Sequence, residues 1–232
     1  VEPDYRESSA DKGLDKPLSA DGSEFRDNIE STLNLLAVAS KKRCEAFIYT
    51  STISVYDGDG PFTEDSATQA ITPYAKTKLI AEQSIRDACR GSSMRGATLR
   101  FAGLHGKNRN SGVVHNFLQR AKIGACLEVV EPNSELRLLF IGDALRAMDA
   151  VLATTNLPSY SCFNIASADK FTTLALAKTV VTISGTGANI KQRASEVKRN
   201  KVMCIRHAKN RLGFYPQGLQ ENLRDMSEDQ LN

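Results

Sequence analysis

Tyr74 and Lys78 are the side chains of this sequence whose types and spacing best suit proton transfer. Residues four apart on a helix emerge on one face, about one turn from each other. An ammonium group near a phenol favours the phenolate, so it lowers the phenol pKa from about 10 toward neutrality. We therefore expect Tyr74 to act as a general acid or base on a carbinol or carbonyl.

Two hydroxyl residues, Ser51 and Thr52, directly follow the apolar run 46–50. Such a run, short, partly β-branched and bounded by polar residues, is typical of a buried parallel strand. Ligands of open α/β sheets bind at the carboxyl ends of the strands. A hydroxyl in this position would orient a substrate oxygen, and the sequence leaves both residues open for that role.

The elements that must position these groups alternate along the chain. Apolar residues at helical spacing, with Gly91 and Gly213 as C-terminal caps, predict helices at 25–40, 73–88, 113–123, 143–153, 172–183 and 205–212. Apolar and β-branched runs predict strands at 46–50, 97–101, 136–141 and 162–165. Strands separated by helices predict an α/β architecture with parallel pairing.

The composition is that of a soluble globular protein, with 41% hydrophobic and 25% charged residues. No apolar run approaches the roughly 20 residues that span a bilayer, so we expect a cytoplasmic protein without a membrane span. The cysteines form no CxxC pair and have no histidine at ligand spacing, which predicts free buried thiols in a reducing compartment and no metal site. They are Cys44, Cys89, Cys126, Cys162 and Cys204.

A basic stretch occupies residues 189–211, where Glu196 is the single acid. Its basic residues are Lys191, Arg193, Lys198, Arg199, Lys201, Arg206, Lys209 and Arg211. The simplest interpretation is a solvated face. Nucleic-acid binding is the alternative, but the stretch lacks the aromatic residues on which bases stack.

Several segments resemble, in order, motifs of the extended short-chain dehydrogenases/reductases, within the NAD-dependent epimerase/dehydratase and 3β-hydroxysteroid dehydrogenase group. The segments are 28–36, 47–56, 73–82, 99–106, 140–144, 163–165 and 208–216. The resemblance covers roughly residues 25–225, and the order of the motifs is more specific than any one of them.

The resemblance implies a Rossmann-like doubly wound parallel sheet, N-terminally truncated, with a small C-terminal α/β substrate-binding lobe. Residues 25–110 would form a partial NAD(P)-binding domain. Residues 111–232 would form the substrate-binding lobe, interleaved with the last strands of the sheet. Residues 1–24 are acidic and poor in apolar side chains, so we expect an irregular segment there.

The resemblance also implies roles for the catalytic residues. Tyr74 is the acid or base, and Lys78 is its partner and a contact to the ribose of the cofactor. Ser51 or Thr52 supplies the third catalytic hydroxyl.

Further residues are implied as binding contacts. Phe101, Ala102 and Gly103, at the end of the second predicted strand, would face the nicotinamide and the substrate. Ser51 and Arg137 are the expected substrate contacts, and the cofactor is NAD or NADP.

The sequence departs from the family in several respects. Its 232 residues contain no GxxGxxG turn, which in the family holds the cofactor pyrophosphate. The nearest string, 185–190, follows a predicted helix and is expected to be a turn into a strand. His105 stands where the family has tyrosine, and we expect His105 and His115 to be loop and helix-surface residues without a catalytic role.

Three hypotheses for function follow. The first is an NAD(P)-dependent oxidoreductase or epimerase acting on a carbinol of a nucleotide sugar, or of a related or steroid-like small molecule, with Tyr74 as base. The second is a non-catalytic accessory subunit that has lost cofactor binding, and the third is a nucleic-acid-binding protein. A homodimer, or a partner chain that covers the truncated edge of the sheet, is the expected assembly.

Overall fold

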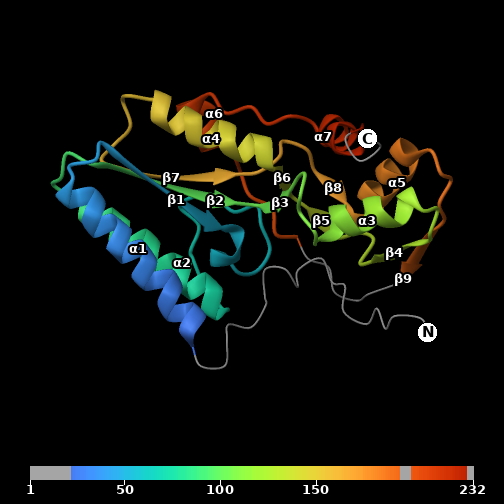
Figure 1. The fold of residues 1–232 in the computed structure, drawn as a ribbon, viewed down its shortest axis with the longest axis horizontal. Helices are drawn as coiled ribbons and strands as arrows, with labels where there is room; N and C mark the ends of the chain where they lie inside the picture. The colour runs from blue at the N-terminus through green and yellow to red at the C-terminus, as the bar shows by residue number, and fades with distance from the viewer. Residues whose placement is uncertain (1–21, 194–199, 229–232) are drawn as a thin grey trace.

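The computed structural model describes residues 22–193 and 200–228 (Figure 1). Its helices are α1 (Ser23–Lys41), α2 (Pro73–Cys89), α3 (Val113–Lys122), α4 (Ile141–Ala153), α5 (Thr173–Ser184), α6 (Arg206–Leu212) and α7 (Leu219–Glu228), with the 3₁₀ turn η1 (Ile53–Val55). Its strands are β1 (Ala46–Thr52), β2 (Arg95–Phe101), β3 (Gly103–His105), β4 (Leu127–Val130), β5 (Glu135–Leu136), β6 (Leu138–Phe140), β7 (Tyr160–Ile165), β8 (Phe171–Thr172) and β9 (Ile190–Arg193). None of the described helices has the length and apolar content needed to cross a membrane.

Three strands form the central sheet in the order β1–β2–β7, and both pairs are parallel. Helices α1 and α2 lie on one face of this sheet, and α4 and α6 lie on the other (Figure 1). Because both faces are covered, Leu99, Phe163 and Ile165 are fully buried. The predicted doubly wound parallel arrangement is confirmed.

The parallel register brings the carboxyl ends of the three strands to one edge. Thr52 of β1 is the partner of Phe101 in β2, which is in turn the partner of Ile165 in β7. Ligand sites of open α/β sheets lie at this edge. The residues that follow β1 and β2 are therefore neighbours in space.

A smaller α/β lobe lies at the right of Figure 1. It contains α3, α5 and α7, the parallel pair β4–β9 and the antiparallel pair β5–β8. Leu127, Leu176 and Leu223 are fully buried in its own apolar cluster. A C-terminal α/β lobe is thus present, and its binding of a substrate stays a prediction.

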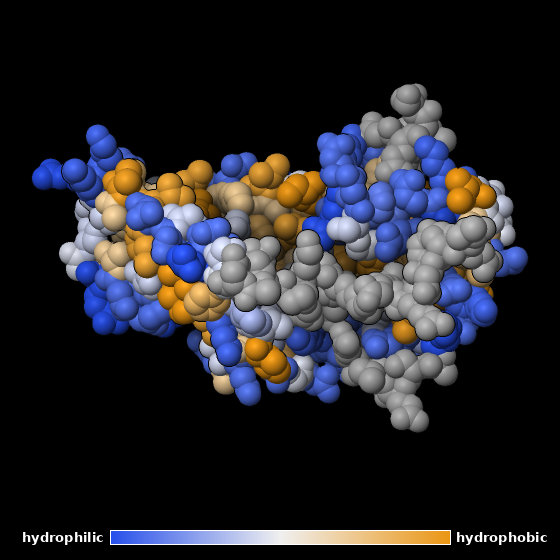
Figure 2. All heavy atoms as spheres, turned by 60° about the horizontal axis from the view of Figure 1, so that its bottom comes forward, coloured by the Kyte–Doolittle hydropathy of each residue, from blue (hydrophilic) through white to orange (hydrophobic). Residues whose placement is uncertain are grey.

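The outer side of α1 carries exposed apolar side chains among polar ones. Leu35 and Val38 are 63% and 56% exposed, whereas Leu36 and Ala39 are buried in a cluster that includes residues of α2. Figure 2 turns this side forward and shows orange surface in the part where α1 and α2 lie. Exposed apolar surface marks contact sites. This face is available to the predicted homodimer, which stays a prediction that sedimentation of the chain would test.

The predicted helices and strands occur in the predicted order, but the prediction missed α7, β3, β4 and β8 and is wrong for one strand. The strand expected at 136–141 is two short strands, β5 and β6, separated by Arg137, and α4 begins at Ile141. The predicted strand is divided in two because its parts have different partners: β5 pairs with β8, and β6 pairs with β3. An apolar run in the sequence does not reveal such a change of partner. The expected irregular segment lies outside the described residues up to position 21, and α1 already begins at Ser23.

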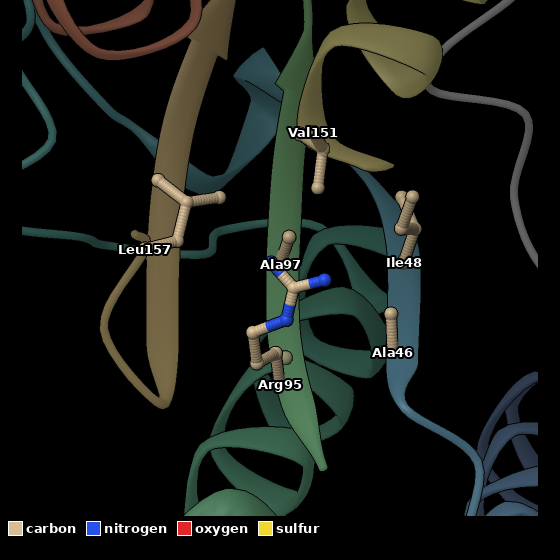
Figure 3. A pocket seen from close by; sticks show the side chains of 7 residues that line it. Ala46, Ile48, Arg95, Ala97, Val151 and Leu157 are labelled. Atoms are coloured by element: carbon tan, nitrogen blue, oxygen red, sulfur yellow. The ribbon is translucent and has the colours of Figure 1, made fainter. Parts of the chain in front are cut away.

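A small hollow lies at the amino end of the central sheet (Figure 3). It is lined by Ala46, Ile48, Arg95, Gly96, Ala97, Val151 and Leu157. Its volume of about 10 Å³ leaves room for one water at most. Since Ala46 and Arg95 are the first residues of their strands, the hollow is at the end opposite Thr52 and is not the candidate site.

Candidate active site

Tyr74 and Lys78 lie in the first two turns of α2. The Thr72 side chain caps this helix and Pro73 occupies its first position, which together fix where it begins. Nζ of Lys78 donates to the carbonyl oxygen of Thr50 at 3.0 Å and lies 5.6 Å from the centroid of the Tyr74 ring. Both side chains are half-buried. The structure therefore brings the pair together beside the end of β1.

Burial sets the pKa of both groups. It raises the pKa of Tyr74 and lowers that of Lys78, whereas the nearby carboxylate of Glu82 raises the pKa of Lys78. The expected lowering of the Tyr74 pKa by the ammonium is wrong. Nζ of Lys78 approaches the rings of Tyr74 and Tyr49, and among the described residues no hydrogen bond joins it to a phenol. Tyr74 therefore keeps its proton at neutral pH.

The structure distinguishes the two candidate hydroxyls, which are both buried. Oγ of Ser51 donates to Oε1 of Glu82 at 2.5 Å, between β1 and α2. Oγ1 of Thr52 accepts the main-chain N–H of Ser54 at 3.2 Å, and in the described parts of the chain its hydroxyl donates no hydrogen bond. Of the two, Thr52 is the residue whose proton remains available to another molecule.

A buried polar network, which the sequence analysis missed, extends from Ser51 across the sheet. Arg100 of β2 binds Glu82 of α2, with Nη2 2.7 Å from Oε2 and Nε 3.1 Å from Oε1. Its Nη1 donates to the hydroxyl oxygen of Tyr56 at 2.7 Å, and Oδ1 of Asn164 lies 2.8 Å from the same hydroxyl. We call these five residues the Glu82–Arg100 network. A charged residue inside an apolar strand, Arg100, was the available signal.

The segment predicted to face the nicotinamide crosses the ends of β2 and β7. Phe101 and Ala102 are buried, and the N–H of Ala102 donates to the carbonyl oxygen of Ile165 at 3.0 Å. Gly103 begins β3, whose partner β6 directly follows Arg137. The structure thus places these residues at the same edge as Thr52. Their contact with a cofactor stays a prediction.

Arg137 is half-buried between β5 and β6. Its Nη1 donates to the carbonyl oxygens of Ser167 at 3.0 Å and Ala168 at 3.4 Å. Its Nε is buried without a hydrogen-bond partner among the described residues. Burial lowers the pKa of Arg137, but a guanidinium stays charged at neutral pH, which suits the predicted contact with an anionic substrate.

His105 is a buried strand residue rather than the loop residue expected, with 4% of its surface exposed. Its Nδ1 has no hydrogen-bond partner among the described residues, and its ring centroid lies 5.7 Å from that of Phe140. Burial, aided by the charge of Arg109, lowers the pKa of His105 to about 4. His115 is half-buried on α3, which agrees with its predicted place on a helix surface.

We expect His105 to make the free energy of unfolding fall in acid. Its imidazole binds a proton near pH 6.5 in the unfolded chain, but only near pH 4 in the folded one. The contribution of the neutral imidazole to the free energy of unfolding is therefore fully present above pH 6.5. It is lost as the pH falls to 4, and the loss amounts to about 3 kcal/mol. Urea unfolding from pH 4 to 7 measures this loss. His105→Leu should flatten the dependence of the free energy of unfolding on pH, and His115→Gln should not. Equal slopes of this dependence in wild type and in His105→Leu would contradict the role of His105.

Three further predictions concern other parts of the chain. All five cysteines are free thiols, but the expected burial holds fully only for Cys89: Cys44 is exposed, and the other three are partly buried. Gly185 has a φ of 65° and caps α5, and the string 185–190 leads into β9, which confirms the predicted turn. Part of the basic stretch, 194–199, lies outside the described residues, and nucleic-acid binding through this stretch is untested.

Comparisons with known proteins add to this geometry. The pattern of the NAD dependent epimerase/dehydratase family matches residues 12–166. The chain is similar to UDP-glucose 4-epimerase of Azospirillum brasilense, with 32% identity over 84 residues, and to that of Dictyostelium discoideum, with 38% over 68. The matches cover 35% and 28% of this chain but 24% and 20% of those relatives. The chain thus matches a quarter or less of their length.

Solved structures share the fold. UDP-glucose 4-epimerase of Thermotoga maritima, solved with UDP-glucose, has a TM-score of 0.78 at 23% identity, over 92% of this chain and 73% of that one. UDP-N-acetylglucosamine 4-epimerase of Bacillus cereus has a TM-score of 0.82 at 24% identity, over 90% and 72%. At these identities the likeness establishes the Rossmann-like epimerase fold and no more.

Proposed function

This chain belongs to the NAD dependent epimerase/dehydratase family, and we propose on that premise an NAD-dependent epimerase or dehydratase that acts on a carbinol of a nucleotide sugar. The observation that carries the proposal is the pair of Tyr74 and Lys78 held at the carboxyl edge of the sheet. Relatives named as UDP-glucose 4-epimerases support a nucleotide sugar as the substrate. Because the matches span a quarter or less of those relatives, activity and substrate both belong to the proposal.

In the proposed reaction, the phenol oxygen of Tyr74 exchanges a proton with the reacting hydroxyl of the sugar. The hydroxyl of Thr52 donates a hydrogen bond to the same sugar oxygen and orients it. Lys78, anchored on the carbonyl of Thr50, places a positive charge beside the phenolate as it forms. Partial burial of Tyr74 and Lys78 strengthens this interaction, because the surrounding dielectric is lower than that of water.

The residues at this edge fit a nicotinamide dinucleotide. Lys78 uses one ammonium proton on Thr50, and an ammonium group has three, so two remain for ribose hydroxyls. Ala102 and Gly103 are small residues beside the end of β2, which suits the approach of a flat ring. When bound, NAD supplies the acceptor and donor of the hydride. These residues fit NADP equally, and binding experiments distinguish the two.

Binding of NAD and turnover of UDP-glucose test the proposal. We expect calorimetry to detect NAD or NADP binding, and chromatography to detect conversion of UDP-glucose by the bound protein. Lys78→Met should weaken cofactor binding by about tenfold or more, the effect of losing about 1.4 kcal/mol. Lys76→Met is the matched control, because Lys76 is an exposed lysine on the same helix and should bind as wild type.

Failure of binding would decide between the hypotheses. If neither NAD nor NADP binds, this polypeptide is not an enzyme by itself, and the non-catalytic accessory subunit is supported. If NAD binds and no nucleotide sugar is converted, a steroid-like or other carbinol becomes the substrate to test.

The two hydroxyls are expected to differ when replaced. Thr52→Val should lower kcat by about 10²-fold, because the donor that orients the substrate oxygen is lost while the shape is kept. Ser51→Ala should cost about 1–3 kcal/mol of stability, because its hydroxyl serves the buried Glu82. Steady-state kinetics and urea unfolding of both variants measure these effects. A larger loss of kcat in Ser51→Ala than in Thr52→Val would reverse the assignment.

A further inference from the structure

Glu82 follows Tyr74 and Lys78 at intervals of four residues along one face of α2. The first two residues are half-buried near the edge of the sheet, whereas Glu82 is only 3% exposed. We propose that the Glu82–Arg100 network is a positioning device, which fixes α2 on the sheet and so holds Tyr74 and Lys78 beside Thr52. The catalytic part of this inference rests on the proposed function.

The geometry of the network fixes the helix in more than one direction. Ser51 and Arg100 are register partners on β1 and β2, and both bind the one carboxylate of Glu82. The planar guanidinium contacts both carboxylate oxygens, with its Nη2 and Nε as donors. A forked contact of this kind restricts rotation as well as distance. Helix α2 therefore cannot slide along the sheet or turn without breaking it.

The same network holds the loop that leads into α2. The ring of Tyr56 stacks on that of Phe62 with centroids 4.7 Å apart. Nδ2 of Asn164 donates to the carbonyl oxygen of Phe62 at 3.1 Å, and the N–H of Asn164 donates to Oε1 of Glu64 at 2.7 Å. Tyr74 is thus held from both sides, by the loop before it and by Glu82 after it.

Charge gives Glu82 a second effect on the site. Burial lowers the pKa of Lys78, and the carboxylate of Glu82 raises it. The network therefore supports the charged form of Lys78 as well as its place. Buried ion pairs are often no more stabilising than apolar residues of similar volume. Fold stability alone therefore gives no reason for an ion pair at this place, whereas a fixed geometry does.

Three variants separate positioning from folding. Glu82→Gln removes the charge, Ser51→Ala removes one hydrogen bond and keeps both charges, and Gln83→Ala changes an exposed neighbour on α2. The first readout needs no substrate: carbon-13 NMR of labelled lysine follows the titration of Lys78, with the signal assigned by Lys78→Arg. We expect the pKa of Lys78 to fall in Glu82→Gln, because the carboxylate that raises it is lost, to change measurably in Ser51→Ala, and to stay as in wild type in Gln83→Ala.

The second readout is turnover of UDP-glucose below the unfolding temperature of each variant. Glu82→Gln should lower kcat by about 10- to 100-fold and keep KM within about threefold of wild type. This is the result expected when Tyr74 and Lys78 are displaced while substrate binding is kept. A folded Glu82→Gln protein with the Lys78 titration and the kcat of wild type would overturn the inference. If wild type itself converts no nucleotide sugar, the proposed function fails, and the Lys78 titration in Ser51→Ala then decides the positioning role alone.

Discussion

Replacing Tyr74 by phenylalanine is expected to lower kcat for the proposed epimerisation by about 10²- to 10⁴-fold, the contribution typical of one general acid–base. The exchange removes the hydroxyl and keeps the ring that Lys78 contacts. In the described parts of the chain this hydroxyl makes no hydrogen bond, so stability should change by less than about 1 kcal/mol. The measurement is kcat with saturating UDP-glucose, together with a thermal melt of each protein.

Tyr49→Phe is the matched control, because Nζ of Lys78 lies 4.8 Å from the centroid of the Tyr49 ring as well. Its kcat should stay within about threefold of wild type. The wild-type kcat/KM should also rise with pH, because burial raises the pKa of Tyr74 and the base form appears only as the pH approaches that value. Equal losses of kcat in the two variants would contradict the role of Tyr74.

The sequence predicts those features of the site that are determined by residues close together in the chain. Pro73 and a preceding Thr72 fix the start of α2, and the spacing of Tyr74 and Lys78 then places both on one face. Likewise, the apolar run 46–50 predicts the strand β1 without knowledge of its neighbours, although these residues are only partly buried because β1 lies at the end of the three-stranded sheet. These features hold because helix caps and side-chain periodicity depend on a few adjacent residues.

Other parts of the site depend on partners distant in the sequence. The hydroxyl of Ser51 is engaged by Glu82, 31 residues later, and no local pattern distinguishes it from that of Thr52. The burial of His105 likewise depends on the pairing of β3 with β6, two very short strands. The pKa of Tyr74 was predicted in the wrong direction because spacing shows that Lys78 is near, but it does not show how deeply both are buried.

Replacing Arg100 by methionine should lower the free energy of unfolding by about 3–5 kcal/mol, the typical cost of breaking a buried ion pair. The side chains of Arg100 and Glu82 are each 4% exposed, so the carboxylate would remain buried with only the hydroxyl of Ser51 as its polar partner in the network. Methionine fills much of the volume of arginine and adapts its shape, which keeps the cavity term small. Urea unfolding at pH 7 measures the loss.

The double variant Arg100→Met with Glu82→Leu separates charge from packing. With no buried carboxylate left unpaired, it should recover most of the stability that Arg100→Met loses. If the losses of the two single substitutions instead add up in the double variant, packing rather than charge explains them, and the interpretation of the ion pair fails. A double variant that is as stable as wild type but turns over slowly would mean that the ion pair contributes position rather than stability. The position of Tyr74 and Lys78 would then depend on two residues in no contact with the substrate.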